Sequence, residues 1–286
     1  MIETLVQGLL LGGLYCLFAL GLSLMFGVMR LTNIAQGDLI VLGGFTAIVV
    51  APMLGMSILA TGAVLIPLAF VVGYLVQRGI LSRALDKDPL PSLVVTFGLA
   101  IVIQNGLLEA FSADPRSLAS GGLNIQSIHF GEQFAVGTLP LIIFAAAALC
   151  TFGMQMLFDK TSLGRAFRAV SDDKEVAELM GLNARTIFAI ATGLAFSLIA
   201  LAGFFQSLRT TVSPADGPQL LLFAFESVII GGMGSFWGTF VGAMVLGLTQ
   251  QIGFKVDPAW GIWLGHLVFL VVLFVRPNGL FPKTKG

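Results

Sequence analysis

Charged side chains are scarce in this sequence. Only 10% of its 286 residues are Asp, Glu, Lys or Arg, against roughly 25% in a soluble domain. Hydrophobic residues make up 57%, and the mean hydropathy is +0.97. This composition excludes a single soluble core and predicts an integral membrane protein that is embedded in a lipid bilayer. The formal net charge is zero, so the chain lacks a basic footprint and we expect no nucleic-acid partner.

Residues that carry catalysis and metal binding are also scarce. There are two histidines and two cysteines, and Cys16 and Cys150 both lie inside apolar runs. This excludes a His/Cys metal cluster and favours buried free thiols over a disulfide. Neither a GxSxG nor a GxxxxGK[ST] motif is present, and no Gly-Lys pair occurs. We therefore predict a chain that is not an enzyme, binds no metal or cofactor itself, and cannot cradle nucleotide phosphates.

Long apolar segments dominate what is present. The first exceeds a signal-peptide core and has no basic residues before it, so we interpret it as a retained span. The second, seventh and eighth are short or interrupted by glycine, which indicates half-helices or re-entrant pieces. We expect one all-α transmembrane domain over residues 1–286, a polytopic helical bundle of eight to ten spans. The candidate segments are 5–28, 38–55, 57–77, 90–111, 135–157, 186–207, 219–232, 236–252 and 260–276.

The basic residues predict an orientation. If the candidate spans alternate, twelve basic residues share one side and three share the other. Because the cytoplasmic side collects Lys and Arg, we expect a cytoplasmic C-terminus and an N-terminus outside, with 112–134 as an external loop. The first group is Arg30, Arg78, Arg83, Lys87, Lys160, Arg165, Arg168, Lys174, Arg185, Arg276, Lys283 and Lys285; the second is Arg116, Arg209 and Lys255.

The loop 159–185 is too long and too charged for a simple connector. It carries five acidic and five basic residues. Ser171, followed by a group of acids that includes Glu175, resembles a capped helix start. An apolar stripe follows, and then Gly181 and Asn183 provide a stop signal. We predict a short amphipathic helix that docks into a partner, with a helix lying on the membrane surface as the alternative. The stripe is Val176, Leu179 and Met180.

Four stretches resemble the permeases of branched-chain amino-acid ABC importers. Glu175, Val176, Ala177 and then Gly181 resemble the EAA…G docking loop of ABC import permeases. The stretch NIAQGDLIVLGGF resembles an Asn-Phe-Ala-His-Gly-Glu signature, with Ile34, Gln36 and Asp38 as departures. The stretches VIIGGMGSFWGTFVGAMVLG and RPNGLFPK resemble the glycine-rich late segment and the ending of that family. The similarity covers nearly the full length.

The resemblance implies an ABC importer permease in a bacterial inner membrane. It implies a second homologous permease subunit, as a hetero- or homodimer, two cytoplasmic ATP-binding subunits and a periplasmic substrate-binding protein. ATP and Mg would be bound by the ATPase subunits. The substrate would be a branched-chain or other small amino acid, with urea, short amides or small carboxylates as alternatives. An ion-coupled secondary carrier is a further alternative, but it would leave the loop 159–185 unexplained.

The stretch LTNIAQGD is a polar break between the first two spans. Asn33 or Asp38 is expected to cap a helix that starts at Leu39, and Gln36 and Gly37 to permit a bend. Composition alone favours a surface turn. The resemblance instead favours a partly buried bend beside the translocation path, so Asn33, Gln36, Gly37 and Asp38 are path candidates.

Glu226 and a set of glycines are the other path candidates. A carboxylate inside an apolar segment must face the bundle interior or a watery cavity. Glu226 is thus expected either to contact substrate or to make a structural hydrogen bond. Gly231 and Gly232 precede a doubled GxxxG at Gly234, Gly238 and Gly242, which favours helix packing over a role in the path. For His266 a hydrogen-bonded packing role is favoured.

Overall fold

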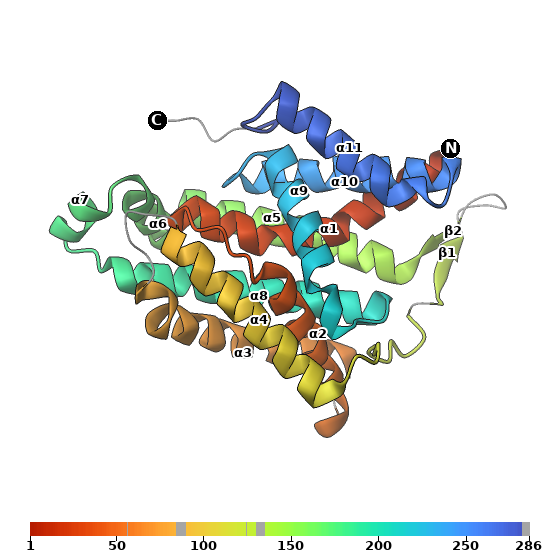
Figure 1. Ribbon diagram of the computed structural model, residues 1–286, viewed down its shortest axis with the longest axis horizontal. Coiled ribbons are helices and arrows are strands. Elements are labelled where there is room, and N and C mark those ends of the chain that lie inside the picture. The colour runs from red at the N-terminus through yellow and green to blue at the C-terminus, as the bar shows by residue number, and fades with distance from the viewer. Residues whose placement is uncertain (56, 84–89, 124, 130–134, 282–286) are drawn as a thin grey trace.

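The computed structural model describes residues 1–55, 57–83, 90–123, 125–129 and 135–281. The described chain is almost entirely helical (Figure 1). The long apolar helices are α1 (Ile2–Met29), α2 (Gln36–Met53), α3 (Ile58–Gly79), α4 (Leu90–Phe111), α5 (Thr138–Lys160), α8 (Ala184–Arg209), α9 (Gly217–Gly231), α10 (Phe236–Val256) and α11 (Trp260–Val275). Each corresponds to one predicted segment, which confirms an all-α membrane bundle.

The number of full spans is smaller than the eight to ten expected. Within the described residues, six helices are long and apolar enough to cross a membrane: α1, α2, α3, α4, α5 and α8. The segment from η2 (Pro214–Asp216) through α9 bends by 117° against α10, and this pair counts as a seventh span when the two are taken together. With 16 residues, α11 is shorter. The glycines of the seventh and eighth segments thus mark the bent pair α9 and α10, whereas the second segment, α2, is one continuous helix of 18 residues and not a half-helix.

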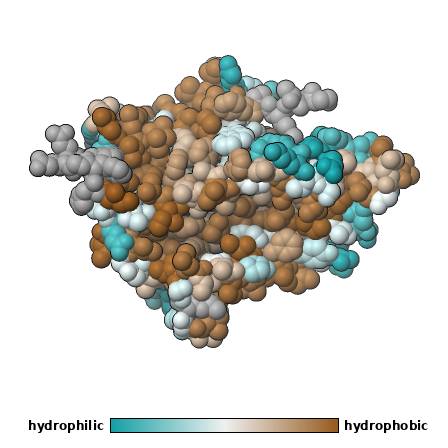
Figure 2. All heavy atoms as spheres, turned by 180° about the vertical axis from the view of Figure 1, so that it is seen from behind, coloured by the Kyte–Doolittle hydropathy of each residue, from teal (hydrophilic) through white to brown (hydrophobic). Residues whose placement is uncertain are grey.

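The helices α1 and α8 form the centre of the bundle. In their most apolar stretches, 83% and 78% of the residues are buried, against 17% in both α3 and α4. A helix that is hydrophobic all round must be buried on all sides, and glycines allow α1 to do this. A Cβ on Gly12 would lie 2.8 Å from the carbonyl oxygen of Ala243 on α10. Figure 2 shows that hydrophobic side chains cover most of the face that is hidden in Figure 1.

The two ends of the bundle differ in charge. One end carries η1 (Leu81–Arg83), α6 (Ser162–Asp172), α7 (Lys174–Leu179) and the turn between α9 and α10. Nine described basic residues of the predicted cytoplasmic group lie there; Lys87, Lys283 and Lys285 fall outside the described residues. At the other end Lys255 lies beside Met1, with Nζ 3.4 Å from the Met1 sulfur. Arg116 pairs with Val212 at that same end. The predicted grouping of charges holds for the residues described.

A small hairpin occupies the predicted external loop. Strand β1 (Ser127–His129) pairs antiparallel with β2 (Ala135–Gly137). The prediction that a span begins at residue 135 is wrong by three residues, because β2 takes 135–137 and α5 begins at Thr138. His129 is the last residue of β1.

Candidate transport and coupling sites

The polar break is buried within the bundle. Helix α1 ends at Arg30, whose backbone is left-handed (φ 52°) and whose N–H donates to the carbonyl of Phe26. The chain then turns back along α1 without regular structure; Leu31, Asn33 and Ala35 are at most 1% exposed. The Gln36 side chain donates to the carbonyl of Phe18 (2.8 Å), about three turns before the end of α1. The break therefore reaches the middle depth of the bundle, and a surface turn is excluded.

Asn33 holds this fold-back in place. Its Oδ1 accepts from the N–H of Ala35 (3.1 Å), and its Nδ2 lies 3.7 Å from the sulfur of Met25. The N–H of Ile34 donates to the Thr96 hydroxyl on α4 (3.3 Å). Backbone at membrane depth needs such partners because no lipid group supplies them. Both ends of the Asn33 amide are thus used within the protein.

The predicted helix start is wrong. Helix α2 begins at Gln36 rather than Leu39, and its N-cap residue, Ala35, has no side-chain cap. Asp38 lies within the first turn and does not cap the helix, while Asn33 supports the turn just before it. The reason is the Asn33 to Ala35 hydrogen bond, which forms a local turn earlier than the apolar pattern indicated.

Two helices begin face to face at this depth. A Cβ on Gly37 would overlap the carbonyl of Gly217, the first residue of α9. The position of Gly37 is therefore set by a close approach between α2 and α9, and not by a bend. On the same side, the Asp38 carboxylate contacts the Cα region of Gly217. We call Gln36, Gly37, Asp38 and Gly217 the helix junction.

The helix junction brings together the positive ends of two helix dipoles. The N-terminal end of a helix carries partial positive charge on its free N–H groups, and both α2 and α9 present such ends here. Asp38 is 5% exposed, and among the described residues no Lys or Arg pairs with it. Helix α9 follows a capping box in which Ser213 and Asp216 bond to each other's backbone. Gln36 Oε1, fully buried, has no partner in the described structure.

Glu226 lies away from the helix junction. It is nine residues beyond Gly217, or about 13 Å along α9. Its Oε1 is 2.5 Å from Nδ1 of His266 on α11, and Glu226 is only 1% exposed. This pairing agrees with the expectation that His266 is a hydrogen-bonded packing residue. Glu226 Oε2 has no described partner.

A second polar pair lies in the same corner of the bundle. The Tyr15 hydroxyl on α1 donates to Gln250 Oε1 on α10 (2.6 Å). Phe223 of α9 stacks on the Tyr15 ring (4.8 Å between centroids) and on the His266 ring (6.3 Å). The sequence analysis did not predict a role for Tyr15 and Gln250. Both are hydrogen-bonding residues inside apolar segments, and the same feature singled out Glu226.

Gly231 and Gly232 form the turn between α9 and α10. Gly232 has φ of 109°, a region that glycine adopts readily. The backbone of Gly231 packs against Gly238, and the N–H of Phe281 donates to the Gly231 carbonyl (2.9 Å). The doubled GxxxG thus packs within the chain. This turn belongs to the end that carries α6 and α7, and it does not join Asp38 or Glu226.

The loop 159–185 contains two helices, α6 and α7. Ser171 does not cap the predicted helix: it belongs to α6, and its hydroxyl donates to the carbonyl of Gly27 on α1 (2.9 Å). Asp173 is the cap, with Oδ1 accepting from Val176 N–H (3.0 Å). Helix α7 ends at Leu179, and Gly181, with φ of 86°, follows its C-cap residue Met180. Asn183 caps the following α8 instead of ending α7.

Helix α7 presents an apolar face to the outside. Val176, Leu179 and Met180 are 54%, 86% and 81% exposed, while Ala177 is buried at 4%. Glu175 lies in the first turn, where the helix dipole favours an acid. The predicted amphipathic helix is present, and its apolar stripe has no cover within the described chain.

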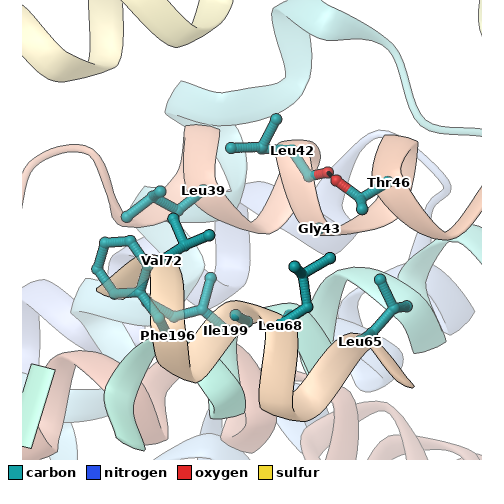
Figure 3. A pocket seen from close by; sticks show the side chains of 11 residues that line it. Leu39, Leu42, Gly43, Thr46, Leu65, Leu68, Val72, Phe196 and Ile199 are labelled. Atoms are coloured by element: carbon teal, nitrogen blue, oxygen red, sulfur yellow. Dashed lines mark hydrogen bonds between the residues drawn. The ribbon is translucent and has the colours of Figure 1, made fainter. Parts of the chain in front are cut away.

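The groove in Figure 3 lies between α2 and α3, with α8 as its floor. It has an empty volume of about 470 Å³. Its lining is aliphatic or aromatic, and the hydroxyl of Thr46 is already bonded to the carbonyl of Leu42. The groove offers nothing to an ammonium or a carboxylate. Among its lining residues are Leu39, Leu65, Leu68, Val72, Phe196 and Ile199.

These features together are those of a membrane transport protein. Helices broken at the middle depth of the bundle, with a carboxylate where two of them begin, are typical of transporters. The family described as the permease component of the branched-chain amino acid transport system matches residues 4–276. The chain belongs to that family, and the resemblance seen in its motifs is confirmed.

Individual relatives agree with this assignment. The chain is 28% identical to the branched-chain amino acid permease BraD of Pseudomonas aeruginosa, over 99% of this chain and 96% of BraD. It is 23% identical to LivH of Escherichia coli, with the same coverage. It is 24% identical to LivM of that organism, over 95% of this chain and 68% of LivM. The solved PsaBC of Streptococcus pneumoniae, in complex with Fab, shares the fold: TM-score 0.51, 13% identity, covering 96% of this chain and 93% of that one.

Proposed function

We propose that this chain is the permease subunit of an ABC importer and forms the translocation path for branched-chain or other small amino acids. ATP hydrolysis, with ATP and Mg bound to two partner ATPase subunits, would energise transport. A homologous second permease and a periplasmic binding protein would complete the importer. The protein would lie in a bacterial inner membrane with its C-terminus in the cytoplasm. Family membership supports the assignment as a permease. The local geometry supports separate roles for α7 in ATPase docking and for the helix junction in the translocation path.

The observation that carries this proposal is the exposed apolar face of α7. Val176, Leu179 and Met180 project from the end of the bundle that collects the basic residues, and that end is cytoplasmic by the positive-inside rule. An amphipathic helix with an unpartnered apolar stripe fits a groove in another protein. The adjacent Glu175, Ala177 and Gly181 match the ATPase-docking pattern of the family.

The helix junction supports a polar route through the bundle. Asp38 is placed beside the beginnings of α2 and α9 and has no described cationic partner. A carboxylate there is suited to the ammonium group of an amino acid, whose own carboxylate the N–H groups of a helix start can receive. Asn33 takes a supporting role, because both ends of its amide already bond within the chain.

The docking role is tested by charge substitution on α7. Leu179→Asp should abolish copurification of the ATPase subunits and ATP-driven leucine uptake, because a carboxylate would replace the most exposed residue of the apolar stripe. The matched control is Leu163→Asp on α6, where the leucine is 38% exposed. The double variant Glu175→Arg/Gly181→Trp is a second disruption. Intact assembly and uptake in Leu179→Asp and the double variant would refute the docking role.

The substrate class needs its own measurement. Uptake of labelled leucine, isoleucine and valine into cells that carry the whole importer should exceed uptake of urea and acetamide. If urea or acetamide uptake were the higher while ATPase docking stayed intact, the chain would still be an importer permease, but for a different substrate. ATP-independent uptake that follows an ion gradient would instead favour a secondary carrier.

A further inference from the structure

The position of His266 in the membrane is unusual for an ionisable side chain. Its ring stacks on Phe223, and Phe223 stacks on Tyr15. Tyr15 is halfway along the 28-residue α1, so these rings share the middle depth of the bundle. Yet α11 lies at the edge of the molecule (Figure 1), and 32% of the His266 side chain is exposed.

Among the described residues, only one nitrogen of the His266 ring has a hydrogen-bond partner. Nδ1 lies 2.5 Å from Glu226 Oε1, whereas no described residue bonds Nε2. An unpaired polar nitrogen is costly in hydrocarbon, and ionisable groups at this depth face protein or water. Glu226 behind it adds a buried carboxylate with an unpartnered oxygen. The surface around His266 is therefore not suited to contact with lipid chains.

Exposed residues on α5 and α4 provide a comparison. Near the middle of α5 the large exposed residues are apolar and include Leu149 and Phe152. On α4 the exposed amide of Asn105 donates to the Ile101 carbonyl of its own helix (2.8 Å) and lies nearer the helix end. Lipid suits these two surfaces better than it suits the His266 side of α11.

One side of α11 is packed against α10. Gly261 and Gly265 pack against Phe254 and Gln250 of α10. On the other side Trp263, Leu270 and Phe274 are 56%, 60% and 91% exposed and share a helix face with His266. We call these four residues the α11 face. Apolar side chains around a central hydrogen-bonding group are the composition of a protein interface.

We propose that the α11 face packs against a second permease subunit, which supplies a hydrogen-bonding partner for His266 Nε2. Only a membrane-embedded protein reaches this depth, and the second permease of the proposed importer is such a protein. This inference rests on the proposed function, which calls for a pair of permeases. His266 is 32% exposed and Glu226 only 1%. Glu226 therefore lies just behind the interface between the two chains, where it holds the His266 ring and acts as a positioning residue.

Photocrosslinking in the assembled importer tests this proposal. The complete complex is placed in phospholipid nanodiscs with Cys150→Ala as background, and benzophenone maleimide is attached to Leu270→Cys. The control label is on Leu149→Cys, which is the same residue type, similarly exposed (71% against 60%) and central in α5. Illumination of Leu270→Cys should shift the permease band by the mass of one further permease chain, identified by mass spectrometry. The Leu149→Cys label should give phospholipid adducts and no such shift.

Two readouts separate the possible failures. Phospholipid adducts alone at Leu270→Cys, or the permease adduct at Leu149→Cys instead, would overturn the α11 interface. ATP-driven amino-acid uptake is measured on the same labelled complexes. If uptake persists while Leu270→Cys marks only lipid, the interface is wrong and the proposed function stands. If the wild-type complex pairs permeases through α11 but shows no ATP-driven uptake, the interface stands and the proposed function fails.

Discussion

Gly37 of α2 lies directly against the carbonyl group of Gly217, where α9 begins. No side chain fits between the two backbones. This contact brings two helix beginnings together in the middle of the bundle and places the Asp38 carboxylate beside them.

Gly37→Ala should therefore destabilise the protein and stop uptake. The added methyl group overlaps the Gly217 carbonyl, and overpacking of this kind costs about 1–3 kcal/mol. Thermal unfolding in detergent and leucine uptake in cells measure the two effects. The control is Gly106→Ala on α4, where a Cβ meets nothing within 4 Å. That variant should keep its uptake and gain about 0.5–1 kcal/mol from the better helix former. Equal behaviour of the two variants would show that the contact is not tight.

Asp38 and Asn33 should separate function from stability. Asp38→Asn preserves shape but removes the charge at the helix junction, so we expect loss of uptake with an unchanged unfolding temperature. Asn33→Ala removes the acceptor for Ala35 N–H, so we expect a loss of about 1–2 kcal/mol of stability. The control for loss of a charge alone is Asp114→Asn, at an exposed residue just after α4. Full uptake in Asp38→Asn would leave the carboxylate without a part in transport.

The sequence predicted the long helices well because their signal is simple. Nine apolar segments each became one helix, and the glycines of the late segments marked the bent pair α9 and α10. Long hydrophobic runs can satisfy their backbone only as helices in a membrane. The positions of charges were also predictable, since basic residues gather at one end whatever the internal packing is.

The tertiary contacts were not predictable in the same way. Ser171 was assigned to cap α7 because Ser before acids is a common helix start, yet it bonds to Gly27, 144 residues away. Helix α6 was not predicted because it lies inside a charged loop. Its apolar side packs against the bundle only after folding, when Phe167 becomes fully buried. Glu226 was singled out because a carboxylate is costly in the membrane. Its pairing with His266 could not be predicted, because it depends on how α11 packs back against α9 in the folded chain.

The Glu226 and His266 pair should behave as a unit. His266→Leu leaves a buried carboxylate without its partner, which costs about 3–5 kcal/mol. Glu226→Leu/His266→Leu removes both groups and should recover most of that loss. A double-mutant cycle on the free energy of unfolding, completed by Glu226→Leu, measures the coupling. Additive losses in the cycle would mean that the 2.5 Å contact contributes nothing to stability.

Ser171→Ala should weaken the link between the docking loop and the bundle. The Ser171 hydroxyl ties α6, and through it α7, to the last turn of α1, and Gly27 there packs against Gly234 in the turn that ends α9. One lost hydrogen bond costs about 1 kcal/mol, so the protein should still fold and bind its ATPases. We expect less leucine moved per ATP hydrolysed, measured in proteoliposomes with both rates followed together. Ser82→Ala is the control, because the hydrogen bond described for that hydroxyl stays within its own segment, to the Arg78 carbonyl. An unchanged ratio in Ser171→Ala would mean that α7 drives the bundle through a different contact.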